Sequence, residues 1–238
     1  MNKPTIVPEL RDIVLGALGL PYMSESCKDG VKTGNHYQSV TLGGRTTEGF
    51  RSQRTELFDA IAFHGKEVLD LGSNLGELSR GARNRGARLV DGYEFDPFFI
   101  EVACAINAAN RTTRVSFFER DITDPSAYED QFDIVLAFSV WHYVGPIVDV
   151  LAQITRELLV VETHRLEENL EAHYLEPVRA YFPAYRILGA SEWSIGGTEH
   201  DRRAVIAFAK SEDALRSGLV APLETARAPV SHDLTHSG

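Results

Sequence analysis

Two glycines and one acidic residue stand at the spacing of a nucleoside-binding site. Gly72 and Gly76 lie between an apolar run, residues 68–72, and an amphipathic stretch, residues 76–85. This is the order of strand, tight turn and helix start that a nucleotide site requires. Glycine adopts a positive φ and leaves the backbone open to a ligand, because it has no Cβ. Glu94 ends the next apolar run, about 20 residues farther on, where a carboxylate can accept two hydrogen bonds from ribose hydroxyls.

The loop lacks the third glycine of a dinucleotide site. Its middle position is Asn74. Enzymes that bind NAD usually carry G-x-G-x-x-G, so that a pyrophosphate can sit on the helix N-terminus. The loop therefore favours an adenosine ligand without a pyrophosphate. A nicotinamide oxidoreductase is the remaining rival, and binding of NAD would support it.

Side chains that can move a proton follow two later apolar runs. His142 and Tyr143 come after residues 132–138, and His164 comes after residues 158–162. Imidazole titrates near neutral pH, so either histidine can take a proton from a hydroxyl, amine or acid acceptor. Tyr143 can orient that acceptor, and Glu162 can position it or cap the next helix. Simple packing at a strand end is the alternative role, and for His142 we weigh the two equally.

Apolar runs alternate with helical patterns along most of the chain, which predicts a parallel sheet covered by helices. The expected strands are residues 68–72, 88–93, 115–118, 132–138, 158–162, 185–188 and 204–209. The expected helices are residues 53–63, 76–85, 97–109, 147–155, 166–181 and 212–216. The last two strands are expected to form a hairpin at the sheet edge. Ligands of such sheets lie beyond the carboxyl ends of the strands, so this edge positions both the loop and the candidate catalytic side chains.

Three segments are expected. Residues 1–63 would supply amino-terminal helices and a substrate or lid segment, in which residues 22–50 form a glycine-rich loop or a short hairpin. Residues 64–210 would form the ligand-binding α/β domain. Residues 211–238 are rich in Ser, Pro, Ala and charged residues, which predicts a flexible tail.

The composition of the chain narrows the range of possible partners. The chain has 24 basic and 34 acidic residues, a formal charge of −10, and this field disfavours nucleic acid as a partner. No apolar run approaches the roughly 20 residues that cross a bilayer, so we expect no membrane partner and a cytoplasmic location. Cys27 and Cys104 stand far apart without a CxxC motif, and no grouped ligand pattern predicts a metal site.

Four motifs, in order, resemble those of class I S-adenosylmethionine-dependent methyltransferases. They are LDLGSNLG, GYEFDP, ERDITD and FDIVLAFSVWHYV. The resemblance implies a Rossmann-like fold, with a mostly parallel seven-stranded sheet, an antiparallel edge strand and helices on both faces. It implies S-adenosylmethionine as cofactor, with Asp121 binding the adenine amino group and Ile122 packing on the ring. The cofactor-binding residues carried over from it are Asp70, Gly72, Ser73, Asn74, Gly76, Glu94, Phe95, Asp121, Ile122 and Ser139. Asn74 departs from the glycine that most members have.

The chain is more distantly similar to the enzymes that carboxymethylate the wobble uridine of tRNA. The similar stretches are TEGFRSQRTELFDAI, FSVWHYV and VVETH. In that group an arginine ahead of the first strand approaches the cofactor carboxylate, and the resemblance assigns this role to Arg51. The acidic chain shows no counterpart of that group's basic surface, so tRNA is disfavoured as substrate.

We expect a methyltransferase that acts on a small molecule, in specialised metabolism. One alternative keeps the cofactor but cyclises its aminobutyrate chain and releases methylthioadenosine. Another is a binding module that has lost turnover. The sequence leaves the oligomeric state open, a homodimer included.

Overall fold

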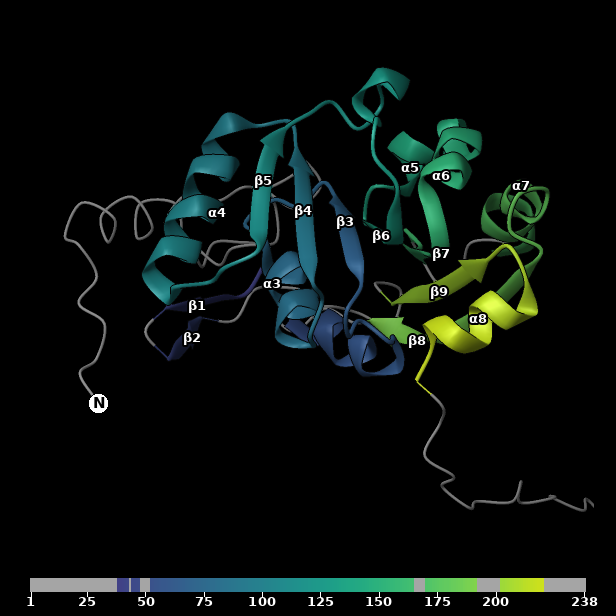
Figure 1. Ribbon diagram of the computed structural model, residues 1–238. Coiled ribbons are helices and arrows are strands. Elements are labelled where there is room, and N and C mark those ends of the chain that lie inside the picture. Colours follow the sequence, from purple (N-terminus) through teal and green to yellow (C-terminus); the bar gives the residue numbers. More distant parts are fainter. Residues whose placement is uncertain (1–37, 43, 48–51, 165–169, 192–201, 221–238) are drawn as a thin grey trace, which may run out of the picture.

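A mixed seven-stranded sheet organises the protein (Figure 1). The computed structural model describes residues 38–42, 44–47, 52–164, 170–191 and 202–220. Within them the strands of this sheet are β3 (Glu67–Leu71), β4 (Leu89–Glu94), β5 (Val115–Glu119), β6 (Phe132–Phe138), β7 (Thr155–Glu162), β8 (Ala184–Ser191) and β9 (Arg203–Ala209). Their order is β5-β4-β3-β6-β7-β9-β8. The strands β3 to β7 pair in parallel, and β9 pairs antiparallel with both β7 and β8. The Rossmann-like fold and the terminal hairpin are thus confirmed.

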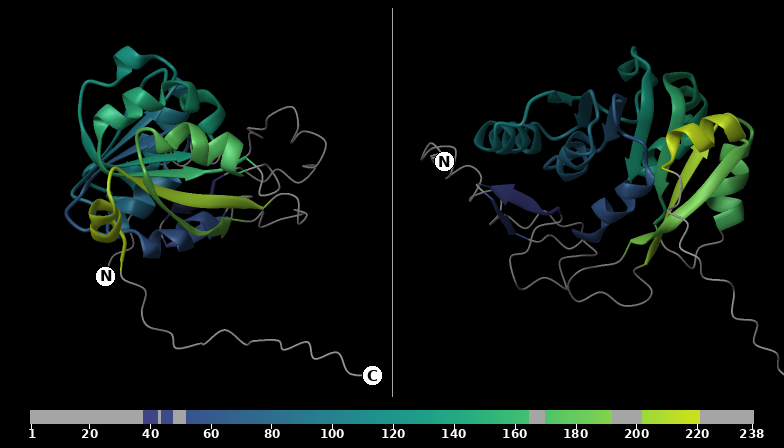
Figure 2. Two further views of the ribbon diagram at one scale, coloured as in Figure 1. Left: turned by 90° about the vertical axis from the view of Figure 1, so that its right-hand side faces the viewer. Right: turned by 60° about the horizontal axis from the view of Figure 1, so that its bottom comes forward.

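The strands form where apolar residues run without interruption, because helices cover both faces of the sheet. In β3, Leu69 and Leu71 face one side, while Val68 faces the other. The first side packs against α5 (Trp141–Val144), α6 (Val148–Ile154) and α7 (Glu176–Arg179). The second packs against η1 (Ser52–Ala60), α3 (Glu77–Asn84) and α8 (Glu212–Gly218). Figure 2 shows these two layers on either side of the strands.

Two elements flank this core on the side of β5. The helix α4 (Pro97–Asn110) packs beside β5, and a short antiparallel hairpin, β1 (Val40–Leu42) with β2 (Arg45–Thr47), lies against α4. Val40 joins the apolar residues of α4, and Asn110 donates a side-chain hydrogen bond to the Thr41 carbonyl at 2.5 Å. The hairpin realises one of the two forms expected within residues 22–50. Most of the rest of that segment lies outside the described residues.

Several helices differ in detail from expectation. The helix expected at 53–63 is present as a 3₁₀ helix, η1, over Ser52–Ala60. The helix expected at 166–181 begins partly outside the described residues, and its visible part joins a π-helical turn, Glu171–Leu175, to α7. Pro177, in the first turn of α7, lacks an N–H donor, and the π-helical turn lies directly before this helix. The short helix expected at 212–216 is present as α8.

The packed part of the chain continues past Lys210. Leu215 and Leu219 are buried against the sheet, and Ile61 forms an isolated bridge with Leu219. The division into an amino-terminal segment, a ligand-binding domain and a tail stays a prediction, and residues 221–238 lie outside the described part. Among the helices that are described, none has both the length and the apolar composition needed to cross a bilayer.

Candidate active site

The glycine loop after β3 is a tight turn that only small or left-handed residues can build. Gly72 and Gly76 have φ of 65° and 77°, and the Gly76 N–H donates to the Ser73 carbonyl at 2.8 Å. A Cβ on Gly72 would stand 2.6 Å from Val140 Cγ1, closer than real contacts allow. Both glycines are therefore needed for the positive φ of the loop, and Gly72 is needed also because Val140 approaches it closely.

Asn74 occupies the middle of this loop with φ of 51°. Asparagine enters the left-handed region more readily than most residues, because its short polar side chain tolerates that backbone. The departure from glycine at this position therefore keeps the positive φ that a glycine would supply.

Glu94 ties the loop to the second strand. Its Oε2 accepts a hydrogen bond from the Asn74 N–H at 2.8 Å, and its Oε1 accepts from the Phe95 and Asp96 N–H groups at 2.9 and 3.1 Å. These bonds fix the carboxylate at the carboxyl end of β4, beside the loop. Three of the four lone-pair sites of the carboxylate are thus used, and the remaining site, on Oε2, can receive a ribose hydroxyl. Phe95 follows it with 70% of its surface exposed, and so offers a ring face to a ligand.

Asp121 and Ile122 stand beyond β5, the next strand of the sheet. The Asp121 carboxylate is exposed and accepts hydrogen bonds from the N–H and hydroxyl of Thr123, which lower its pKa. Ile122 is buried, and its Cδ1 would lie 3.9 Å from a Cβ on Gly72. The Tyr128 hydroxyl donates to the Ile122 carbonyl at 2.6 Å and holds this turn. The structure thus brings Ile122 beside the glycine loop, as the adenine assignment requires.

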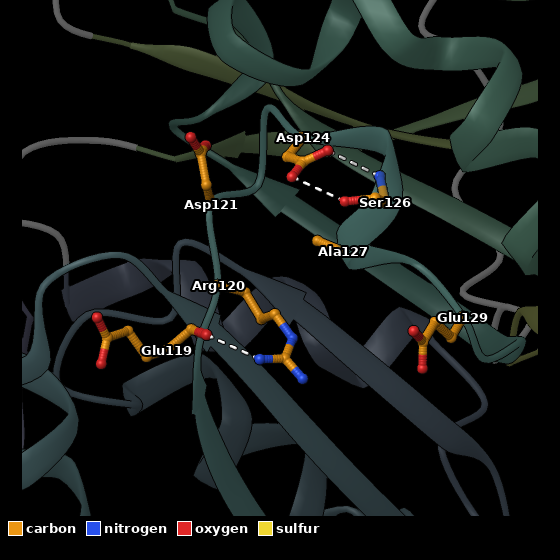
Figure 3. A pocket seen from close by; sticks show the side chains of 7 residues that line it. All are labelled: Glu119, Arg120, Asp121, Asp124, Ser126, Ala127 and Glu129. Carbon is orange, nitrogen blue, oxygen red and sulfur yellow. Dashed lines mark hydrogen bonds between the residues drawn. The ribbon is translucent and has the colours of Figure 1, made fainter.

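A polar cavity of about 250 Å³ adjoins this turn (Figure 3). Its walls are Glu119, Arg120, Asp121, Asp124, Ser126, Ala127 and Glu129. In Figure 3 the Asp124 carboxylate is held by the N–H and hydroxyl of Ser126, at 2.9 and 2.8 Å. The carboxylate of Asp121 points away from Arg120 in that view. The adenine-binding role of Asp121 stays a prediction.

Two buried polar groups beneath the loop bear on the cofactor fit. Asp70 is buried on β3 and accepts a hydrogen bond from the Ser79 hydroxyl at 2.5 Å, and burial raises the pKa of Asp70 to about 6. The Ser73 Oγ is buried without a hydrogen-bond partner among the described residues. An unpaired buried hydroxyl costs free energy unless a ligand group satisfies it. This hydroxyl fits a polar ligand group at the loop.

The amino-terminal segment also holds the loop, through a residue that the sequence did not single out. Gln38 is 2% exposed, and its amide donates from Nε2 to the Ser73 carbonyl at 3.2 Å. Its Oε1 accepts from the Glu77 N–H, at the start of α3, at 3.1 Å. Gln38 thus spans the loop from end to end. A single glutamine before a short hairpin gives no signal of this role.

A buried charged cluster lies at the carboxyl ends of β6 and β7, and we call it the Glu162 cluster. Its members are Arg54, Ser139, Glu162, Ser191 and Arg203. Glu162 is fully buried, with Arg54 Nη1 and Arg203 Nη1 each 3.5 Å from its Oε2. The Ser191 hydroxyl donates to Oε1 at 2.6 Å. The Glu162 carboxylate is thus enclosed at the strand end, where it binds side chains of the protein itself.

Ser139 is the centre of this cluster. It has φ of 63°, and its hydroxyl donates to Glu162 Oε2 at 2.5 Å. The same oxygen accepts from Arg203 Nη1 at 2.8 Å and from Arg54 Nη1 at 3.3 Å. These bonds occupy the side chain of Ser139 at the end of β6. The cofactor role of Ser139 stays a prediction.

Arg51 lies outside the described residues, and its predicted role is untested. Arg54, three positions later, is 1% exposed and reaches Ser139 and Glu162. Arg54 thus brings an arginine from η1 to the carboxyl ends of β6 and β7. Arg54, Ser191 and Arg203 were missed because they join the cluster from three distant segments.

The three candidate catalytic side chains come together at this edge. The rings of His142 and His164 lie 5.8 Å apart between centroids, and the ring of Tyr143 lies 3.8 Å from that of His142. The His164 N–H donates to the Tyr174 hydroxyl at 2.7 Å, which fixes its backbone. Burial and, to a smaller extent, the nearby Arg203 guanidinium lower the pKa of His142. His142 is therefore neutral at pH 7 and can accept a proton.

Comparison with known families agrees with this geometry. Residues 69–160 match the model of a methyltransferase domain, and this stretch holds the glycine loop, Glu94, Asp121 and Ser139. Residues 69–160 are thus similar to a methyltransferase domain, and such a domain implies S-adenosylmethionine as the cofactor. No curated protein sequence matches the chain. Among the described residues, no group of His, Cys, Asp and Glu is arranged to hold a metal ion.

Three solved structures share the fold. The bifunctional kinase-methyltransferase WbdD aligns with a TM-score of 0.54 and 21% identity, over 68% of this chain and 41% of its own. A Streptococcus mutans protein described as a SAM-dependent methyltransferase has a TM-score of 0.54 and 15% identity, over 71% and 55%. A Pyrococcus horikoshii protein described as an RNA methyltransferase has a TM-score of 0.50 and 20% identity, over 62% and 76%. This chain therefore spans less than two thirds of the first two proteins, and at these identities the likeness concerns the fold.

Proposed function

We propose that the protein transfers a methyl group from S-adenosylmethionine to a small-molecule acceptor. The observation that carries this proposal is the position of His142 and His164. They follow the ends of different strands, and their ring centroids lie 5.8 Å apart. Like the glycine loop, they lie at the carboxyl ends of the parallel strands. A cofactor held by that loop would present its reactive end toward these two rings.

When bound, the cofactor supplies an electrophilic methyl carbon on its sulfonium. Attack of the acceptor's lone pair on this carbon would form the new bond, break the carbon–sulfur bond and leave S-adenosylhomocysteine. His142 takes the proton that the acceptor loses, because its lowered pKa leaves the imidazole neutral at pH 7. Tyr143, beside it, orients the acceptor, and His164 receives or relays the proton. Alignment of the two reacting atoms supplies most of the remaining acceleration.

A small acceptor is favoured over a nucleic acid by charge. The formal charge of −10 repels a phosphate backbone, which a nucleic-acid methyltransferase must neutralise with Lys and Arg. The fold itself does not decide this, because one of the similar structures is described as an RNA methyltransferase. A cytoplasmic location and a role in specialised metabolism belong to the same proposal.

Product analysis tests the reaction. Calorimetry first measures binding of S-adenosylmethionine and S-adenosylhomocysteine, and mass spectrometry then follows the cofactor in mixtures with candidate acceptors. Formation of S-adenosylhomocysteine with a methylated acceptor supports the proposal. Methylthioadenosine would instead show cyclisation or another alkyl transfer. Tight binding without consumption across a broad acceptor panel would indicate a binding module, and binding of NAD in place of S-adenosylmethionine would refute the cofactor.

A further inference from the structure

The Glu162 cluster contains more positive than negative charge around one carboxylate. Glu162 is 0% exposed, and it is shared by two buried guanidinium groups, those of Arg54 and Arg203. Arg54 also interacts electrostatically with Asp70 and Glu77, and its positive charge acts to lower the pKa of both carboxyl groups. Among the described residues, Glu162 is the carboxylate that pairs with Arg203. Because Glu162 also pairs with Arg54, it compensates the positive charge of Arg203 only in part.

One N–H donor of Arg203 makes no hydrogen bond with the described residues. Its Nη1 donates to Ser139 Oγ at 2.8 Å, but its Nε is buried and has no hydrogen-bond partner among the described residues. The whole residue is 8% exposed. A buried cation with an unused N–H is costly, and an anion that binds beside it removes this cost. A planar carboxylate matches the guanidinium fork in shape as well as in charge.

The topology places this guanidinium on the acceptor side of the site. Arg203 begins β9, which runs antiparallel to β7, so its Cα lies at the same edge as the carboxyl ends of β6 and β7. It acts electrostatically on His142, the candidate base. The cofactor's ribose and adenine positions, at Glu94 and Asp121, lie on the strands on the other side of β3. An anion at Arg203 would therefore neighbour the group that loses its proton.

We propose that Arg203 binds a carboxylate of the acceptor, so that the substrates of this protein are small carboxylic acids or their amino and hydroxy derivatives. This inference rests on the proposed function, since it presumes that His142 faces an acceptor. Arg203 holds the acid group at the end of β9 while His142 meets the atom to be methylated. The specificity of the site is then set by charge, because the carbonyl oxygen of a neutral amide or ester can accept from Nε but leaves the excess positive charge uncompensated.

Acetate, with neutral acetamide as the matched probe, tests the carboxylate site directly. Binding is followed by NMR of the His142 ring in the full chain saturated with S-adenosylhomocysteine, with chloride used to hold the ionic strength constant. Acetate should shift this resonance in a saturable manner, and acetamide should not. Arg203→Gln should weaken acetate binding by about tenfold or more, as expected for loss of a charge-assisted bond. Arg203→Lys, which keeps the charge but not the fork, should fall between.

Arg156→Gln is the control, because Arg156 pairs with Glu67 and Asp133 at the opposite edge of the sheet. It should leave acetate binding unchanged. Thermal unfolding of each variant shows that it is folded. Equal acetate and acetamide effects, or acetate binding that persists in folded Arg203→Gln, would overturn the inference. So would a loss of S-adenosylmethionine affinity in Arg203→Gln, which would assign the arginine to the cofactor's own carboxylate. Failure to bind S-adenosylhomocysteine at all would instead refute the proposed function.

Discussion

Replacing Glu94 by alanine should weaken binding of S-adenosylmethionine by about 1–3 kcal/mol, or roughly 5–150-fold in Kd. The carboxylate accepts three backbone N–H bonds, at 2.8, 2.9 and 3.1 Å, and these hold it where ribose hydroxyls would meet it. Alanine removes the charge-assisted bonds to the ribose and frees the Asn74 N–H from its partner. Both losses act on the cofactor site.

A thermodynamic cycle separates these two losses. Calorimetry with adenosine and with 2′,3′-dideoxyadenosine measures the contribution of the ribose hydroxyls in each protein. The wild type should bind adenosine more tightly, whereas Glu94→Ala should hardly distinguish the two ligands. Glu176→Ala, at an exposed position on α7, serves as the control and should behave like the wild type. Unchanged S-adenosylmethionine affinity in Glu94→Ala would show that the ribose contact is misplaced. Equal discrimination in both proteins would show that Glu94 acts only by holding the loop.

Three other substitutions test the site and its support. Gly72→Ala should lower the free energy of unfolding by about 1–3 kcal/mol more than Gly65→Ala, because both have positive φ but only the first would place a Cβ against Val140; equal losses in urea unfolding would disprove the clash. Asp70→Asn should flatten the pH dependence of stability. Since burial raises the pKa of Asp70 from 3.8 to about 6, the wild type should lose about 3 kcal/mol as pH rises from 4 through 6, and parallel curves for the two proteins would contradict this. Arg51→Ala should weaken binding of S-adenosylmethionine more than binding of adenosine, and equal effects would remove Arg51 from the carboxylate role.

The sheet was predictable because its strands are short apolar runs bounded by turn residues. The run at 132–138 matches β6 at both ends, and the glycine loop follows β3 as the motif requires. Strand ends were less predictable: β7 begins at Thr155 although the expected strand began at 158, because Arg156 and Glu157 break the apolar run yet lie at the start of the strand. Their charges are paired there, with Glu67, Asp133 and Lys66.

The Glu162 cluster could not be predicted, because its members come from η1, β7, β8, β9 and the end of β6. Arg54 and Glu162 are 108 positions apart, and Ser139 and Arg203 are 64 apart. Their pairing depends on the sheet order, which brings β9 between β7 and β8. Sequence motifs report what a short segment does, and so they located the loop, Glu94 and the histidines but no long-range ion pair. The cofactor and catalytic roles of the individual residues remain predictions.

The two hydrogen bonds of Gln38 connect the glycine loop to the part of the chain that enters β1. One holds the Ser73 carbonyl and the other holds the Glu77 N–H, so Gln38 fits the loop in one conformation. A coupling free energy between two sites is reciprocal. A ligand that holds Gln38 in this conformation would therefore raise the affinity for S-adenosylmethionine, and the cofactor would raise the affinity for that ligand by the same factor.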